Sequence, residues 1–259
     1  MDDEILHYRS ALTYNREVFL IEHGVLMKAF GAIDGNFSTL IEVPRTMRDA
    51  NGQSHVSIIP FVFLLQRQSR AAFEAFAAFQ SYQAWVLLRP GLEALLIVGK
   101  WVDDPTNAKV WEDRKQDWRS YQKAYSGQAL RSKSLPSSDG IQRVLSKVND
   151  DFVHANPDYY GRHLKMGAGD PGYVNFWLGY FDEDILHEAH VLAFLHLLLV
   201  MQEGLASLLA RLFATGVTLQ APLASFLRDF AARVTELASQ SEDAASTLQQ
   251  LGLVVLEAT

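Results

Sequence analysis

The sequence predicts an all-α protein, a helical bundle of seven or eight helices in a single domain over residues 1–259. Apolar residues recur mostly at helical spacing, and no two segments show the alternation that a strand pair needs. The chain has 259 residues, 49% of them hydrophobic, which is enough to bury a sizeable core. We expect the core in residues 58–157 and 182–238, with loops near 44–56 and 157–172.

The elements of the first half follow from their apolar spacing and their start signals. Residues 3–41 predict one or two helices, and residues 58–78 predict a helix that carries Pro60 in its first turn. A further helix ends near Val102. Asp104 and Pro105 then supply an N-cap and a proline at the first helical position, so a new helix begins there and runs past Tyr125.

The second half is predicted from the same signals. A helix runs from Gly140 to about His154, because Asn156 and Pro157 end it. Residues 157–172 look irregular, and residues 173–181 are β-leaning without a partner strand. A long apolar helix covers residues 182–214. An amphipathic helix begins near Pro222, and a shorter helix follows it.

Composition excludes several classes of function. The absence of cysteine excludes disulfides, zinc–thiolate sites, iron–sulfur clusters and thiol catalysis. The net charge of -7 argues against a surface built overall for nucleic acid. The most apolar run, residues 191–201, is shorter than a membrane span, and the acidic start is unlike a signal peptide. We therefore expect a soluble cytoplasmic protein without a membrane segment, and we predict no cofactor.

A charged pair and a proline interrupt the apolar stretch WVLLRPGLEALLIVGKWVDD, residues 85–104. Arg89 and Glu93 are four residues apart, so on a helix their side chains meet on one face. Leucines surround the pair, which predicts that part of it is removed from water and matched by hydrogen bonds. Pro90 cannot donate to the carbonyl of Val86, which predicts a kink in the same turn.

Two motifs, LLRPGLEALLIVGKWVDD and the later VNDDFVHANP, resemble a group of uncharacterised bacterial all-helical proteins. In that group an Arg-x-x-x-Glu helix precedes a helix that ends in a valine–histidine dipeptide before a proline. The resemblance covers residues 58–157. The group is distantly similar to the HEPN class of nucleotide-binding or RNA-cleaving helical modules, whose motif is an arginine followed by four to six residues and a histidine. This chain has literal matches at Arg16–His23 and Arg48–His55.

A metal-independent ribonuclease needs a base, an acid and a cation for the phosphorane. His154, Glu93 and Arg89 would fill these roles if the fold brings their helices together, because Arg89 and His154 are far apart in the sequence. The alternative is structural: the three side chains form a buried polar network that fixes helix packing.

The segment DEDILHEAH places Asp184, His187 and His190 three residues apart. On a helix this spacing lets a carboxylate and two imidazoles converge, as in the metal sites of helical bundles. A dinuclear iron site would need a second motif of the right kind on another helix, and we predict none. The alternative is a polar first turn whose acids favour the helix N-terminus.

The main concentration of basic residues lies with a series of aromatic residues between residues 111 and 133. This combination is typical of RNA binding through stacking and phosphate contacts. The aromatics share one helical stripe and the cations another, which also fits a core face and a solvated face. The candidate nucleic-acid-binding residues are Arg114, Lys115, Arg119 and Lys123, beside Trp111, Trp118, Tyr121 and Tyr125.

Three functions follow from these patterns. The first is a helical binding or interaction module with a buried Arg89–Glu93–His154 cluster. The second is a HEPN-like metal-independent ribonuclease acting in stress or phage defence, and the third is a metal-binding bundle. We expect a homodimer, with RNA as a candidate partner.

Overall fold

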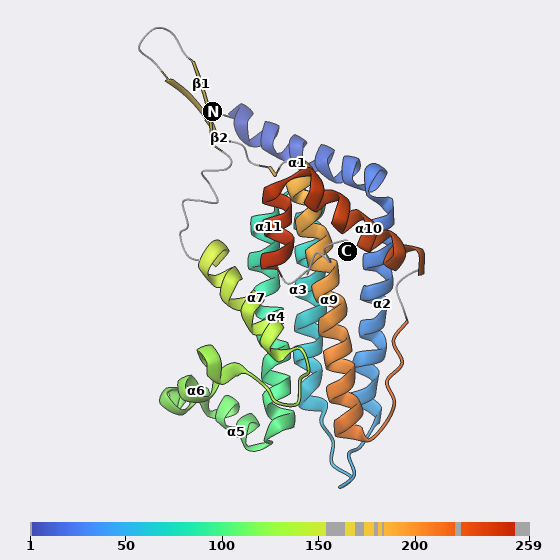
Figure 1. The fold of residues 1–259 in the computed structure, drawn as a ribbon. Coiled ribbons are helices and arrows are strands. Elements are labelled where there is room, and N and C mark those ends of the chain that lie inside the picture. Colours follow the sequence, from blue (N-terminus) through green and yellow to red (C-terminus); the bar gives the residue numbers. More distant parts are fainter. Residues whose placement is uncertain are drawn as a thin grey trace.

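Four long helices run side by side and form the centre of the fold in the computed structural model (Figure 1). They are α2 (Gly24–Thr46), α3 (Ile59–Ala77), α4 (Ser81–Asp103) and α9 (Asp184–Phe213). The structure describes residues 2–153, 164–168, 174–178, 181–182, 184–220 and 224–251. Apolar side chains at helical spacing meet between the four helices, so the core forms one continuous cluster. Its largest fully buried members include Trp85, Phe37, Phe76, Phe194 and Leu65.

Further helices pack around this centre. Helix α1 (Asp2–Glu22) crosses one end against α2 and α3, and α7 (Ser138–Val148) packs on α4. Helices α10 (Ala224–Gln240) and α11 (Glu242–Gln250) pack on α9. Single turns of 3₁₀-helix lie at Val56–Ile58 and Gly127–Leu130. The all-α prediction is confirmed, but the described residues contain ten α-helices rather than seven or eight. The single-domain assignment stays a prediction.

The segment after α4 accounts for part of the difference between the predicted and the observed number of helices. We expected one helix from Pro105 past Tyr125, and the chain instead forms α5 (Thr106–Glu112), a 3₁₀ turn (Asp113–Lys115) and α6 (Trp118–Tyr125). The break lies at Asp117, whose side chain accepts a hydrogen bond from the backbone N–H of Ser120 and caps a new helix. These elements form a lobe beside the lower part of α4 (Figure 1), which we call the basic lobe.

The region expected to be irregular contains a hairpin. Strand β1 (Leu164–Ala168) pairs antiparallel with β2 (Val174–Leu178), with Met166 opposite Phe176. The β-leaning residues of β2 were recognisable from the sequence, but its partner, LKMGA, lies in a glycine-rich stretch that we had assigned to a loop. The prediction of an unpaired extended segment was therefore wrong, and this hairpin is the one strand pair in the described part of the chain.

A buried polar network ties α2 to α9. The side chain of Asn36 donates to Gln202 Oε1 (3.2 Å), and Gln202 Nε2 donates to the carbonyl of Ile33 (2.7 Å). Asn36 also exchanges two hydrogen bonds with the backbone of Gln220. Asn36 and Gln202 are 3% and 0% exposed, so these hydrogen bonds replace the hydrogen bonds to water that the two side chains lose on burial.

Helix α9 is the most apolar element of the fold. In the described residues it is the one helix long and apolar enough, at Ile185–Phe213, to cross a membrane, and 72% of its most apolar window is buried inside the protein. Its neighbours α2, α4, α10 and α11 cover it. This combination of length, hydropathy and burial is compatible with a buried core helix.

Candidate functional site

Arg89 lies at the edge of the bundle, where α4 meets the end of α7. Its guanidinium contacts the Glu93 carboxylate, with Nη2 and Oε1 2.9 Å apart, and its Nε donates to Asn149 Oδ1 at 2.5 Å. Glu93 is one helical turn away on α4, as its spacing predicted. Asn149 was not predicted, because it is 60 residues distant in the sequence. Arg89 thus connects α4 to the segment that follows α7.

That segment is a π-helical turn, Asn149–Val153. Such turns insert an extra residue into the hydrogen-bond ladder and often occur at functional sites. The turn buries Phe152 against Tyr82 and Trp85, and Lys147 holds Asp151 at 2.5 Å. His154 follows directly and lies outside the described residues, so its predicted approach to Arg89 and Glu93 stays a prediction.

The charged pair is partly buried and hydrogen-bonded, as the sequence predicts. The side chains of Arg89 and Glu93 are 33% and 35% exposed, which places them at the rim of the bundle. The surrounding leucines face different sides of α4: Leu88 is fully buried, whereas Leu87 is 37% exposed. Helix α4, 23 residues long, continues through Pro90 without ending there.

The two histidines of the candidate metal site are buried between aromatic rings. His187 is 0% exposed, and its ring stacks on Phe79 with a centroid distance of 4.2 Å. Its Nδ1 lies 3.4 Å from Ser81 Oγ, while no hydrogen-bond partner for Nε2 occurs among the described residues. Burial lowers the pKa of His187 to about 3, although the nearby Asp182 carboxylate opposes the shift. His187 is therefore neutral at physiological pH.

His190 has a separate partner. Its Nδ1 accepts a hydrogen bond from Trp85 Nε1 at 3.0 Å, so the neutral ring carries its own proton on Nε2. Within the described ranges, no group of three potential ligands could hold a metal ion. The side chain of Asp184 lies outside the described part, so the Asp184–His187–His190 metal site stays a prediction.

In the two segments that match the arginine–histidine motif, Arg16–His23 and Arg48–His55, Arg16 and His55 contact acidic side chains outside the motif's own pair. Arg16 lies 3.9 Å from Glu74 on the exposed face between α1 and α3. His55 contacts Asp49 at 2.8 Å within the loop after α2, and the histidine hydrogen bond is the largest cause of the lowered pKa of Asp49. The first contact joins two side chains on the surface, and the second holds the loop after α2 in its conformation.

The basic lobe contains an aromatic ladder that runs from the core to the surface. Trp101 Nε1 donates to the hydroxyl of Tyr125 at 3.0 Å, and that hydroxyl donates to the carbonyl of Asn107. Tyr125 stacks on Tyr121, and Tyr121 lies against Trp118, each pair with centroids 5.2 Å apart. Burial raises the pKa of Tyr125 to about 12. The ladder is anchored at its buried end.

Its outer end is Trp118, which is 59% exposed. We had placed Trp118 on one stripe with Trp111, but the helix break before α6 removes that register. Trp111 instead packs edge-on against Phe61 and Trp101 in the core. The expectation that all the aromatics form a core face is therefore wrong for Trp118.

The four candidate cations separate into two environments. Arg114 lies over the Trp111 ring at 3.6 Å and donates to the Trp111 carbonyl, so it belongs to the packing of the lobe. Lys115, Arg119 and Lys123 are exposed and have no ion pair within the described ranges. Arg119 and Lys123 are four residues apart on α6 and so share one face; Arg119 directly follows Trp118, and Lys123 is two residues from both Tyr121 and Tyr125.

The acidic residues nearby are largely engaged. Asp113 pairs with Lys109 at 2.9 Å, and Asp117 caps α6. Residues 106–125, which form the lobe, carry five basic and three acidic side chains, in a chain whose net charge is -7. The lobe is therefore a local region of positive charge on an acidic protein.

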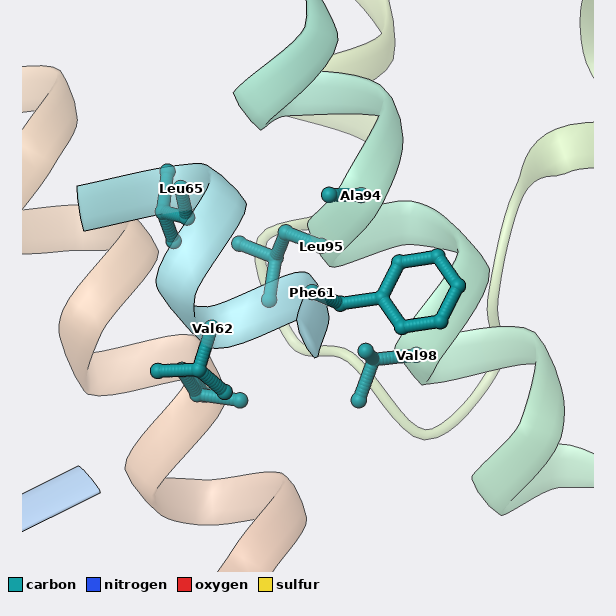
Figure 2. A pocket seen from close by; sticks show the side chains of 7 residues that line it. Phe61, Val62, Leu65, Ala94, Leu95 and Val98 are labelled. Atoms are coloured by element: carbon teal, nitrogen blue, oxygen red, sulfur yellow. The ribbon is translucent and has the colours of Figure 1, made fainter. Parts of the chain in front are cut away.

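A small apolar gap lies between α3, α4 and α9. Figure 2 shows Phe61, Val62, Ala94 and Leu95 among the side chains around it, which are all apolar. The space leaves no room for a water molecule and contains no polar group that would orient a ligand. We interpret it as a packing imperfection of the core.

The fold and these sites define the class as an all-α bundle with a rim cluster at Arg89 and a basic, aromatic lobe. Comparison with protein-family models, curated proteins and solved structures finds no match for this chain.

Proposed function

We propose that this protein is a helical binding module, and that it binds single-stranded RNA through the basic lobe. The observation that carries the proposal is the exposed Trp118 at the end of an anchored ladder, in the same lobe as the exposed Lys115, Arg119 and Lys123. Single-stranded nucleic acid is bound by this pair of features: bases stack on aromatic rings while cations follow the phosphates.

The anchoring of the ladder supports the proposal. A ring that is already held costs less conformational entropy to immobilise when a base stacks on it. Tyr121 supports Trp118 from the inner side, and the hydrogen-bonded Tyr125 supports Tyr121. One stacked base contributes about 1–3 kcal/mol, so a short site of a few bases gives moderate affinity.

Fluorescence anisotropy with a labelled single-stranded RNA tests the proposal at low salt. We compare the parent with Trp118→Ala and with a variant in which Lys115, Arg119 and Lys123 are changed to Gln. The matched control changes Lys28, Arg67 and Arg143 to Gln, because these cations are also exposed but lie outside the lobe. It keeps the same net charge as the lobe variant.

We expect the lobe variant to lose at least tenfold in affinity and Trp118→Ala to lose about tenfold. The control should lose clearly less than the lobe variant. Equal losses in the lobe and control variants would mean that only net charge matters, and would contradict a site on the lobe.

The Arg89 cluster supports a second, enzymatic candidate. A guanidinium that is one-third exposed, and joined to the turn directly before His154, fits the cation role of a metal-independent ribonuclease. The same labelled RNA, incubated in EDTA, tests this. Cleavage by the parent that is absent in folded Arg89→Ala and His154→Ala variants supports the nuclease. An intact probe rejects it.

The proposal places the protein in the cytoplasm, where single-stranded RNA is abundant. The burial of α9 and the cysteine-free composition are compatible with this location.

A further inference from the structure

The outer face of α1 concentrates exposed apolar side chains. Of the thirteen large hydrophobic residues that are exposed in the described part of the chain, six lie in the first 25 residues. On α1 they are 53–81% exposed, in a protein whose other helices bury most of theirs. Patches of this kind on a soluble protein mark interaction surfaces. The α1 members are Ile5, Leu6, Tyr14, Leu20 and Ile21.

A stripe along this face has a palindromic spacing. Leu6, Arg9, Thr13, Glu17 and Leu20 follow one another at intervals of three, four, four and three residues, and all five are exposed. Intervals of three and four place them on one side of the helix, as in the seam of a coiled coil. Phe19, on the opposite side, is fully buried against the bundle.

The palindrome makes the stripe complementary to itself. When two copies of α1 pack antiparallel about a two-fold axis at Thr13, Leu6 of one copy lies level with Leu20 of the other. Arg9 then lies level with Glu17, so the opposite charges meet twice. Within the described residues, neither Arg9 nor Glu17 has an ion pair inside its own chain. We propose that this face of α1 binds a second copy of the same protein, antiparallel and centred on Thr13.

The acidic charge of α1 argues against a membrane surface, which is the main alternative binding partner for this face. Residues 2–22 carry five acidic and two basic side chains, which an anionic membrane surface repels.

The small area of this face of α1 indicates a weak dimer. A helix of 21 residues is about 30 Å long, and a face about 10 Å wide buries about 300 Å² per partner. Stable interfaces bury about 800 Å² per partner, so we expect a weak dimer that forms only at high protein concentration.

Charge-swap variants of the full chain, followed by sedimentation velocity from about 5 to 300 μM, test the pairing. Arg9→Glu places two acids opposite each other, and Glu17→Arg places two bases opposite each other, so each variant alone should stay monomeric. An equimolar mixture of the two variants should dimerise, because both contacts are then between opposite charges. The double variant should dimerise like the parent.

The chain has no cysteine, so a single introduced cysteine can test the proposed two-fold axis at Thr13 by disulfide cross-linking. Thr13→Cys places one thiol of each copy beside the other, so mild oxidation should give a disulfide-linked dimer. Ser38→Cys, exposed on α2, is the control and should stay monomeric.

A monomeric parent at 300 μM would overturn the proposal. So would single charge variants that dimerise as well as the parent, or equal cross-linking of the Thr13→Cys and Ser38→Cys variants. Binding of a monomeric parent to vesicles of anionic phospholipid would assign the face to a membrane and also overturn it.

Discussion

The central bundle and the basic lobe use polar residues in opposite ways. In the bundle, Asn36, Gln202 and Glu188 are almost fully buried and hydrogen-bonded to other helices. In the lobe, Lys115 and Arg119 are exposed and have no ion pair in the described ranges. Buried polar groups must be matched because the core excludes water, whereas exposed ones are free to meet a ligand. The difference supports the proposal that the bundle is a scaffold and that the basic lobe binds the ligand.

The largest effect is expected in the bundle. Gln202→Ala removes the side-chain donor to the carbonyl of Ile33 and one acceptor of Asn36, while opening a cavity. We expect the free energy of unfolding to fall by about 3 kcal/mol in urea denaturation. The control, Glu203→Ala, changes an exposed neighbour on the same helix and should stay within about 0.5 kcal/mol of the parent. Equal stability of the two variants would contradict a structural network.

The next effect concerns pH and His187. Burial lowers the pKa of this histidine to about 3, below the 6.5 of an unfolded chain. The unfolded state therefore takes up the proton first, so the contribution of neutral His187 is complete above pH 6.5 and is lost as the pH falls toward 3. Between pH 7.5 and pH 5 the loss is about 2 kcal/mol.

Unfolding curves of the parent and His187→Phe at several pH values measure this. The variant removes the titrating group, so its stability should fall less between pH 7.5 and pH 5. Phe76→Leu is the control, because it changes the same aromatic cluster without removing a titratable group and should shift stability equally at each pH. A parallel pH dependence in His187→Phe and the parent would contradict the assignment.

The smallest expected effect is that of Asn149→Ala, which tests whether the Arg89 cluster contributes to stability and not to RNA binding. Asn149→Ala removes the acceptor of Arg89 Nε but leaves the contact with Glu93. We expect a loss of about 1 kcal/mol in stability and no change in RNA affinity, because the cluster joins α4 to the π-turn. Asp150→Ala, at the exposed neighbouring position, is the control. A loss of RNA affinity at full stability would move the binding site to Arg89.

The sequence predicts those features that depend on local pattern. The bounds of α3, α4 and α9 follow from apolar spacing, and the Arg89–Glu93 pair follows from a four-residue interval. The break at Asp117 was missed because one capping hydrogen bond decides between one helix and two. That break exposes Trp118, so the proposed RNA site depends on it.

Partners distant in the chain were not predictable in the same way. Asn36 and Gln202 are 166 residues apart, and no local pattern marks either one as a member of a pair. Asn149 meets Arg89 only because α7 packs on α4. Asp182 accepts from the backbone N–H of Ser81 across 101 residues. These contacts depend on how the helices assemble, so a single sequence gives no signal for them.

The salt dependence of RNA binding tests the central claim most directly. The logarithm of the association constant falls with the logarithm of salt concentration, with a slope of about -0.7 for each phosphate contact on a single strand. Changing Lys115, Arg119 and Lys123 to Gln should reduce the magnitude of this slope by about 2, while the control triple variant keeps the slope of the parent. An unchanged slope in the lobe variant would contradict the assignment of RNA binding to the basic lobe.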